Sequence, residues 1–157
     1  MFNEFTRALP GAAMLARLIY TSAIAMPIGP ADITALLRKA RLRNALSGLS
    51  GLLTFDSRFF LQAIEGSPRA INDLYSGIVN DPRHRQVTLL KYGRIGTRMF
   101  PDWQMGFLSA SAEHRALYSK VMPGGEFDPF AIDGDQAEAL MADLAAAGAR
   151  NDESVSA

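Results

Sequence analysis

The sequence contains no cysteine, and this absence excludes whole classes of chemistry. A chain without thiols has no disulfide, no thiol nucleophile and no zinc–thiolate site. It has two histidines, His84 and His114, and neither has metal-ligand spacing to the other or to a pair of carboxylates. We therefore expect no metal site, while the redox state of the compartment stays open.

An excess of charge and long apolar runs are also missing. Sixteen basic and sixteen acidic residues cancel, so the net charge gives no reason to expect nucleic acid or an anionic membrane as a partner. No apolar run approaches the roughly 18 residues of a membrane span. The opening MFNEFTRALPGAAM lacks the basic and apolar regions of a secretory signal. These absences predict a soluble, cytoplasmic protein.

The common enzyme motifs are absent as well. There is no P-loop lysine, no G-x-G-x-x-G and no G-x-S-x-G nucleophile turn. A ferredoxin-like acylphosphatase needs an arginine in the loop after its first strand, and TSAIAMPIGP supplies none. The sequence therefore argues against an ordinary hydrolase or transferase.

What is present indicates one domain with a regular order of elements. The chain has 157 residues, of which 48% are apolar, enough for a sizeable core. Hydrophobic periodicity and turn signals predict strands and helices in the order βαββαββ. The strands are expected at 17–22, 48–55, 58–65, 86–95 and 102–108, and the helices at 30–41 and 68–79. This order predicts an α+β, ferredoxin-like sheet with two helices on one face.

Two further helices are expected after Leu108, at 112–121 and 136–147. In the second of them, Leu140 and Leu144 lie one turn apart among alanines, so we expect this helix to dock on the free face of the sheet. The predicted organisation is a leader at 1–14, a central domain at 15–110, a helical extension at 111–149 and a disordered tail at 150–157.

One polar residue lies within a strongly apolar run. In FFLQAIEG, strand alternation places Gln62 on the same side as Phe60 and Ile64. A buried carboxamide without partners costs roughly 1–3 kcal/mol, so Gln62 must have a hydrogen-bonding partner.

Other polar groups have both a structural and a functional interpretation. Tyr20 shares a strand face with Leu18 and fits a core tyrosine whose hydroxyl reaches the surface. Asn44 follows the first helix and fits a helix-ending asparagine. Trp103 and Met105 share a strand face and fit core positions. The basic cluster fits a solvated helix end or a phosphate site; its members are Arg38, Lys39, Arg41 and Arg43.

A planar heteroaromatic ring with carbonyl and imide groups, such as a flavin, would account for several of these residues together. Lying between the two amphipathic helices, it would meet Asn44 at its imide edge, and Gln62 would link it to Tyr20. A carboxamide is both donor and acceptor, so it has two hydrogen-bonding arrangements, as a switch requires.

These residues resemble the BLUF domain, the blue-light sensor that binds FAD. The similar stretches are LIYTS, NALSGLSGLL, FFLQAIEG, DPRH and FPDWQMGF, in order over about residues 15 to 110. From Tyr20, the family pattern places an asparagine 24 residues on, a glutamine 42 on, a tryptophan 83 on and a methionine 85 on. Those positions are Asn44, Gln62, Trp103 and Met105.

The resemblance implies a role for each matched residue. Tyr20 would be the photochemical electron and proton donor. Gln62 would relay the proton and rearrange to hydrogen-bond the flavin C4 carbonyl, and Asn44 would bind the C4 and N3 edge. Trp103 and Met105 would lie on the last strand and carry the signal outward.

The resemblance also implies a set of contacts with the cofactor. The residues expected to pack on the ring are Leu36, Leu53, Phe60 and Ile78, and those expected in a polar loop beside the ring and its ribityl chain are Asp81, Arg83 and His84. Two positions depart from the family pattern. Arg43 stands where the family often has a histidine or asparagine, and it would reach phosphates or flank the flavin. Ala40 lacks a hydroxyl that some members have.

Together these features predict a short, stand-alone photoreceptor that is not an enzyme. About 47 residues follow Ala110, so we expect no output domain, signalling to a partner protein in trans and a homo-oligomer. FAD rather than FMN rests on the resemblance alone. Two alternatives stay open: a flavin-binding or oligomerising module of this fold that no longer responds to light, and a small flavin electron-transfer enzyme, for which no nicotinamide motif is visible.

Overall fold

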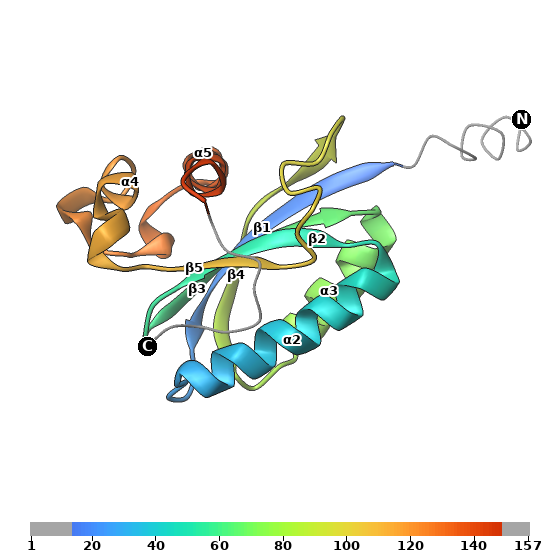
Figure 1. The fold of residues 1–157 in the computed structure, drawn as a ribbon, viewed down its shortest axis with the longest axis horizontal. Helices are drawn as coiled ribbons and strands as arrows, with labels where there is room; N and C mark the ends of the chain where they lie inside the picture. Colours follow the sequence, from blue (N-terminus) through green and yellow to red (C-terminus); the bar gives the residue numbers. More distant parts are fainter. Residues whose placement is uncertain (1–13, 149–157) are drawn as a thin grey trace, which may run out of the picture.

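A five-stranded sheet forms the centre of the molecule, in a computed structural model that describes residues 14–148. The strands are β1 (Leu15–Ile24), β2 (Ser50–Phe55), β3 (Phe59–Gly66), β4 (His84–Ile95) and β5 (Gly106–Ser109). Their order is β4-β1-β3-β2-β5, with β5 parallel to β2 and the other pairs antiparallel (Figure 1). The predicted α+β, ferredoxin-like fold is confirmed.

Two helices, α2 (Pro30–Ser47) and α3 (Pro68–Val79), cover one face of the sheet (Figure 1). Each begins with a proline, which has no N–H to leave unpaired in the first turn. In α3 the Ser67 side chain caps the helix by accepting a hydrogen bond from the Ala70 amide. Helix α2 ends at Gly48, whose φ of 68° is a left-handed conformation that glycine adopts without strain.

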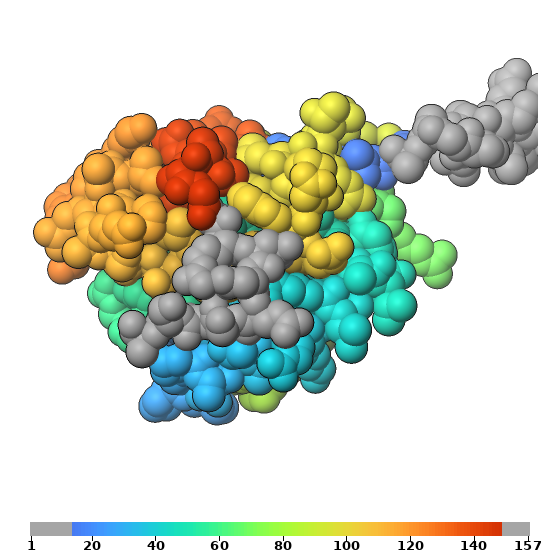
Figure 2. All heavy atoms as spheres, in the orientation of Figure 1, coloured from blue at the N-terminus to red at the C-terminus, as the bar shows by residue number. Residues whose placement is uncertain are grey.

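The opposite face carries the C-terminal segment. It contains α4 (Arg115–Ser119), α5 (Gly134–Ala146) and three 3₁₀ turns, η1 (Ala112–His114), η2 (Pro123–Gly125) and η3 (Pro129–Ala131). Leu140 and Leu144 of α5 are buried in one cluster with Ile19, Leu52 and Leu61 of the sheet. The prediction that this pair docks on the free face is therefore confirmed. Figure 2 shows α5 (red) and the segment after β4 (yellow) meeting on one surface of the molecule.

Three predictions of local structure were wrong. Asn44 does not follow the first helix but lies inside α2, because the helix continues to Gly48, the first residue with a left-handed conformation. The helix expected at 112–121 is a 3₁₀ turn followed by the five-residue α4.

The third error concerns Trp103 and Met105, which precede β5 and so lie on no strand. Turns at Pro101 and Asp102 interrupt the extended backbone that the apolar pattern predicted. Trp103 packs against the cluster under α5, whereas Met105 is buried in the cluster under α2. The two side chains thus point to opposite faces of the sheet.

The predicted tail lies outside the described residues, and so does the predicted leader apart from Met14.

Candidate functional site

A cavity of about 260 Å³ lies between the sheet and the two helices α2 and α3. Strands β1, β2 and β3 form its floor, and the turn between α3 and β4 closes one side. Its lining residues are Tyr20, Leu36, Lys39, Ala40, Arg43, Leu53, Phe60, Gln62, Asp73, Leu74, Gly77, Ile78, Asp81, Arg83 and His84. Two adjoining hollows share residues with the cavity, one through Leu36, Lys39 and Arg83 and the other through Arg43, Asp73 and Leu74.

Tyr20 and Gln62 meet on the floor of the cavity because they are directly paired across β1 and β3. The Tyr20 hydroxyl donates a hydrogen bond to Gln62 Oε1. The Gln62 Nε2 group donates to Met105 Sδ at 3.3 Å. Both residues are buried, so the partners that the sequence required for Gln62 are Tyr20 and Met105.

Burial also sets the protonation of Tyr20. Removal from water raises the pKa of this phenol far above its ordinary value, and the cation of Arg43 offsets part of the rise. The hydroxyl therefore stays protonated at any physiological pH and acts as the donor toward Gln62.

The rim of the cavity carries five charged residues. Lys39, Arg43 and Arg83 are cationic, and Asp73 and Asp81 are anionic, so cations exceed anions by one (three minus two). Arg83 pairs with Asp81, with Nη2 2.6 Å from Oδ2, and its hydrogen bonds lower the pKa of Asp81 to about 2. The pKa of Arg43 is lowered because the side chain is partly removed from water.

His84 occupies the first position of β4, and its ring lies close to Tyr20 and Phe60. The centroid of the His84 ring lies 6.2 Å from that of the Tyr20 ring and 5.0 Å from that of the Phe60 ring. His84 Nδ1 lies 2.7 Å from the Ser22 hydroxyl. Burial is the main cause that lowers the pKa of His84, so the neutral ring is favoured in the folded chain.

Asn44 is not in the cavity lining and instead lines a separate hollow with Ser50 and Gln104. Its Nδ2 group donates to the Gln104 carbonyl at 2.5 Å. Its Oδ1 atom is buried and has no hydrogen-bond partner among residues 14–148. An unpaired buried acceptor of this kind requires a donor from a bound group or from water.

Most of the residues predicted for the site thus come together. Ten line the cavity: Tyr20, Leu36, Arg43, Leu53, Phe60, Gln62, Ile78, Asp81, Arg83 and His84. Met105 adjoins the cavity through its hydrogen bond with Gln62. Asn44 lines a separate hollow with Ser50 and Gln104, and Trp103 lies on the other side of the sheet.

Sequence reasoning missed Asp73 and Gly77, which lie one turn apart on the cavity side of α3 next to Leu74 and Ile78. The helical spacing of 73, 74, 77 and 78 was a signal that could have revealed them.

The side chains in and around the cavity fit a flavin. An apolar slot formed by Leu36, Leu53 and Ile78 suits a planar ring. Asn44 Oδ1 supplies an unused acceptor for an imide N–H, and the cationic rim suits phosphate. Within residues 14–148, no group of three histidine, aspartate or glutamate side chains could hold a metal ion. In the same residues, no helix combines the length and apolar character needed to cross a bilayer.

Known proteins with the same sequence pattern are light sensors. The family model for sensors of blue-light using FAD (BLUF) matches residues 15–106. The photoactivated adenylate cyclase subunit beta of Euglena longa is 38% identical over 96 residues, which is 60% of this chain and 11% of that protein. The chain thus spans about a tenth of the length of the curated relatives that it matches.

Solved structures agree in fold. The dark-state structure of BlrB, a BLUF protein, gives a TM-score of 0.73 with 31% identity, and covers 86% of this chain and 97% of that chain. Klebsiella pneumoniae BlrP1, solved with FMN and cyclic diGMP, gives a TM-score of 0.58 with 36% identity over 62% of this chain and 26% of that chain.

Proposed function

Because the chain belongs to the BLUF family of blue-light sensors that use a flavin, we propose that it is a photoreceptor in which Tyr20 and Gln62 form the light-driven switch. The observation that carries this proposal is the hydrogen-bonded series Tyr20–Gln62–Met105 at the cavity wall. It joins a phenol, a carboxamide and a thioether, and only the carboxamide has its donor and its acceptor on separate atoms, so that turning the group exchanges them.

When bound, the flavin supplies a ring that absorbs blue light and can accept an electron. Tyr20 would be the adjacent donor of an electron and a proton, because burial keeps its hydroxyl protonated, and it would recover both when the ring returns to its ground state. Gln62 would relay the proton out and back and would turn its amide in between, which exchanges the positions of Oε1 and Nε2. The turned amide faces Met105 with its oxygen, and a thioether has no proton to donate. Turning Gln62 therefore breaks its bond to Met105.

We propose FAD as the resident flavin. Asn44 would hold the imide edge of the ring with the Oδ1 atom that has no partner among the described residues. Lys39, Arg43 and Arg83 would face the phosphates, because they place three cations around the cavity and its adjoining hollows. Since BlrP1 was solved with FMN, the choice between the two flavins rests on the family description.

We propose that the chain itself performs no enzymatic step and signals to a separate protein. The relatives named as cyclases are much longer than the matched segment, so that segment corresponds to a sensor part of them. Homo-oligomerisation and a cytoplasmic location remain predictions, and sedimentation of the purified chain in darkness and in light tests the first of them.

The test is an absorption spectrum of the flavin-loaded protein in darkness and after blue light. The wild type is expected to show a flavin spectrum that shifts to the red, keeps its shape and relaxes in darkness. Tyr20→Phe is expected to bind flavin without this shift, because the donor hydroxyl is gone. Tyr75→Phe is the matched control, because the Tyr75 ring lies 5.8 Å from Tyr20 yet is not part of the hydrogen-bonded series.

The other outcomes separate the alternatives. Bound flavin with an unchanged spectrum would indicate a light-insensitive module. Reduction by NADH or NADPH with turnover of an acceptor would indicate an electron-transfer enzyme. Failure to bind FAD or FMN after reconstitution would contradict the flavin site itself.

A further inference from the structure

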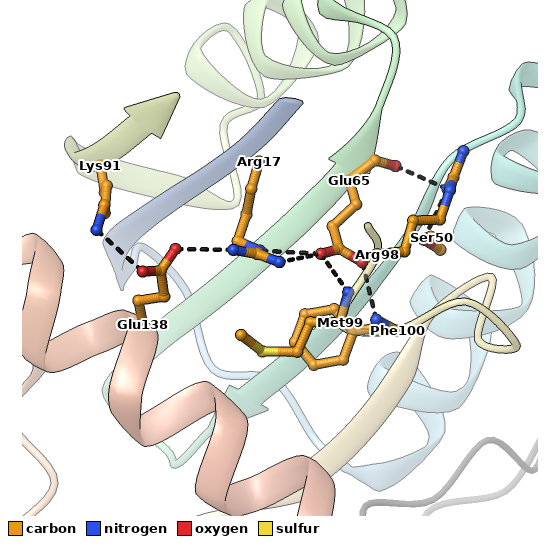
Figure 3. Close-up of polar contacts among 8 residues, drawn as sticks. All are labelled: Arg17, Ser50, Glu65, Lys91, Arg98, Met99, Phe100 and Glu138. Carbon is orange, nitrogen blue, oxygen red and sulfur yellow. Dashed lines mark hydrogen bonds and ion pairs between the residues drawn. The ribbon is translucent and has the colours of Figure 1, made fainter. Parts of the chain in front are cut away.

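A carboxylate is buried in the sheet close to the proposed switch. Glu65 lies three residues after Gln62 on β3, so strand alternation turns it to the opposite face, and it is 0% exposed. Arg17 donates to Glu65 Oε2 through Nε at 2.9 Å and approaches the same oxygen with Nη2 at 2.7 Å. The amides of Met99 and Phe100 donate to the carboxylate at 2.8 Å each (Figure 3).

The two amides belong to a segment, residues 99–105, that passes from one face of the sheet to the other. At its start, Phe100 is buried in the cluster under α5 and stacks on Trp103 with ring centroids 6.0 Å apart. At its end, Met105 accepts the hydrogen bond from Gln62, and its carbonyl accepts one from Arg41 Nε at 3.0 Å. The segment is thus held by Glu65 at one end and by the proposed switch at the other.

The same carboxylate is connected to α5 by charges of alternating sign. Arg17 Nη1 donates to Glu138 Oε2 at 2.8 Å, and Lys91 Nζ donates to Glu138 Oε1 at 2.9 Å (Figure 3). The side chains become more exposed along this series, from 0% at Glu65 to 11% at Arg17 and 28% at Glu138. The network therefore runs from the buried sheet to the surface of α5.

We propose that Glu65 is a positioning residue that joins the segment 99–105 to α5, so that displacement of Met105 changes the docking of α5. A buried carboxylate cannot leave its donors without leaving charged or polar groups unpaired, so Glu65, Arg17 and the two amides move together. The inference rests on the proposed function, because light supplies the displacement of Met105 through Gln62.

The test uses the exposed end of the network, since Glu65 itself is fully buried. Glu138→Gln removes the charge that Arg17 and Lys91 share and leaves the Glu65 bonds to the segment in place. Asp143→Asn is the matched control, because Asp143 lies on the same helix as Glu138 but outside the network, and its exposed ion pair is with Lys120 at the end of α4. The readout is amide hydrogen exchange of residues 134–146 in the flavin-loaded full chain, in darkness and under blue light, with the absorption spectrum recorded on each sample.

In the wild type and in Asp143→Asn, we expect the α5 amides to exchange several-fold faster under blue light. In Glu138→Gln, the spectral shift is expected to remain while the light-minus-dark difference at α5 falls by about half or more.

A shifted spectrum with unchanged exchange at α5 in the wild type would overturn this inference alone, and so would a full difference in Glu138→Gln. A spectrum that does not shift would overturn the proposed function and, with it, the inference.

Discussion

At the scale of single residues, Gln62 has two partners of very different strength. The Tyr20 hydroxyl is a good donor and holds the amide oxygen, whereas the Met105 sulfur is a weak acceptor and holds the amide nitrogen. The stronger bond, from Tyr20, fixes the orientation of the amide. The weaker one, to Met105, couples that orientation to the segment before β5. Under the proposed mechanism, one turned amide therefore has a consequence outside the cavity.

The neutral state of His84 predicts how stability depends on pH. Burial lowers the pKa of His84 in the folded chain; Asp81 opposes this effect and Arg83 adds to it. The unfolded chain takes up a proton near its ordinary pKa of about 6.5, which the folded chain resists. The His84 contribution to stability is therefore complete above that pH and is lost as the pH falls below it. We expect His84→Gln to flatten this part of the pH profile.

The measurement is urea unfolding of the wild type and His84→Gln at matched flavin saturation, between about pH 8 and about pH 5. The difference between the two proteins at the alkaline end is the baseline, because histidine is neutral there in both states. Parallel profiles through the acidic range would show that His84 does not cause the dependence.

At the scale of elements, one glycine allows α5 to start against β4. A Cβ at Gly134 would lie 2.3 Å from the Leu90 carbonyl oxygen and 2.9 Å from Lys91 Cβ. The first of these contacts is with backbone, so the first turn of α5 would have to move away from the strand. We expect Gly134→Ala to destabilise the fold by about 1–3 kcal/mol, as overpacking does, although alanine favours a helix. Thermal or urea unfolding measures the loss.

Gly93→Ala is the control on β4 itself, because a Cβ there meets no atom within 4 Å. It is expected to be neutral or slightly stabilising, since glycine weakens a strand. Equal stability of Gly134→Ala and Gly93→Ala would mean that α5 does not depend on close approach to β4.

The elements show where a sequence predicts structure and where it does not. The paired strands around Asp56 and the two proline-initiated helices follow from period, caps and turn residues, and all of them are present. The strand predicted for the stretch before β5 was wrong, because its apolar residues divide between the cluster under α5 and the cluster under α2. Alternation along one strand does not produce this pattern. The prediction that the first helix ends before Asn44 was wrong, because helix-favouring residues continue through Ala45 and Leu46 to Gly48.

The site was more predictable from the sequence than its surroundings. Gln62 was identifiable because a polar group in an apolar strand requires a partner. The family resemblance then supplied its neighbours, nine of which line one cavity together with Gln62. The role of Glu65 could not be predicted, because its donors come from Arg17 and from two backbone amides that are remote in sequence.

At the scale of the whole molecule, both faces of the sheet carry apolar clusters: one lies under α5, and two lie on the side of α2 and α3. Alternate residues of β1 and β3 point to the flavin side and to the α5 side, so neither layer can be altered without affecting strands that serve the other. This arrangement predicts that α5 contributes to the stability of the entire domain instead of folding as an independent appendage.

Leu144→Ala tests this prediction. Leu144 is 0% exposed in the cluster under α5, so its truncation is expected to lower the free energy of unfolding by about 2–5 kcal/mol, in a single transition that includes the flavin-binding side. Leu46→Ala, on the outer face of α2 with 87% exposure, is the control and should change stability by less than about 0.5 kcal/mol. Urea unfolding would be followed by Trp103 fluorescence and by release of bound flavin. If Leu144→Ala shifted the first signal and left flavin release at the wild-type urea concentration, the two faces would unfold separately, and a mechanical connection through the shared sheet would lose its basis.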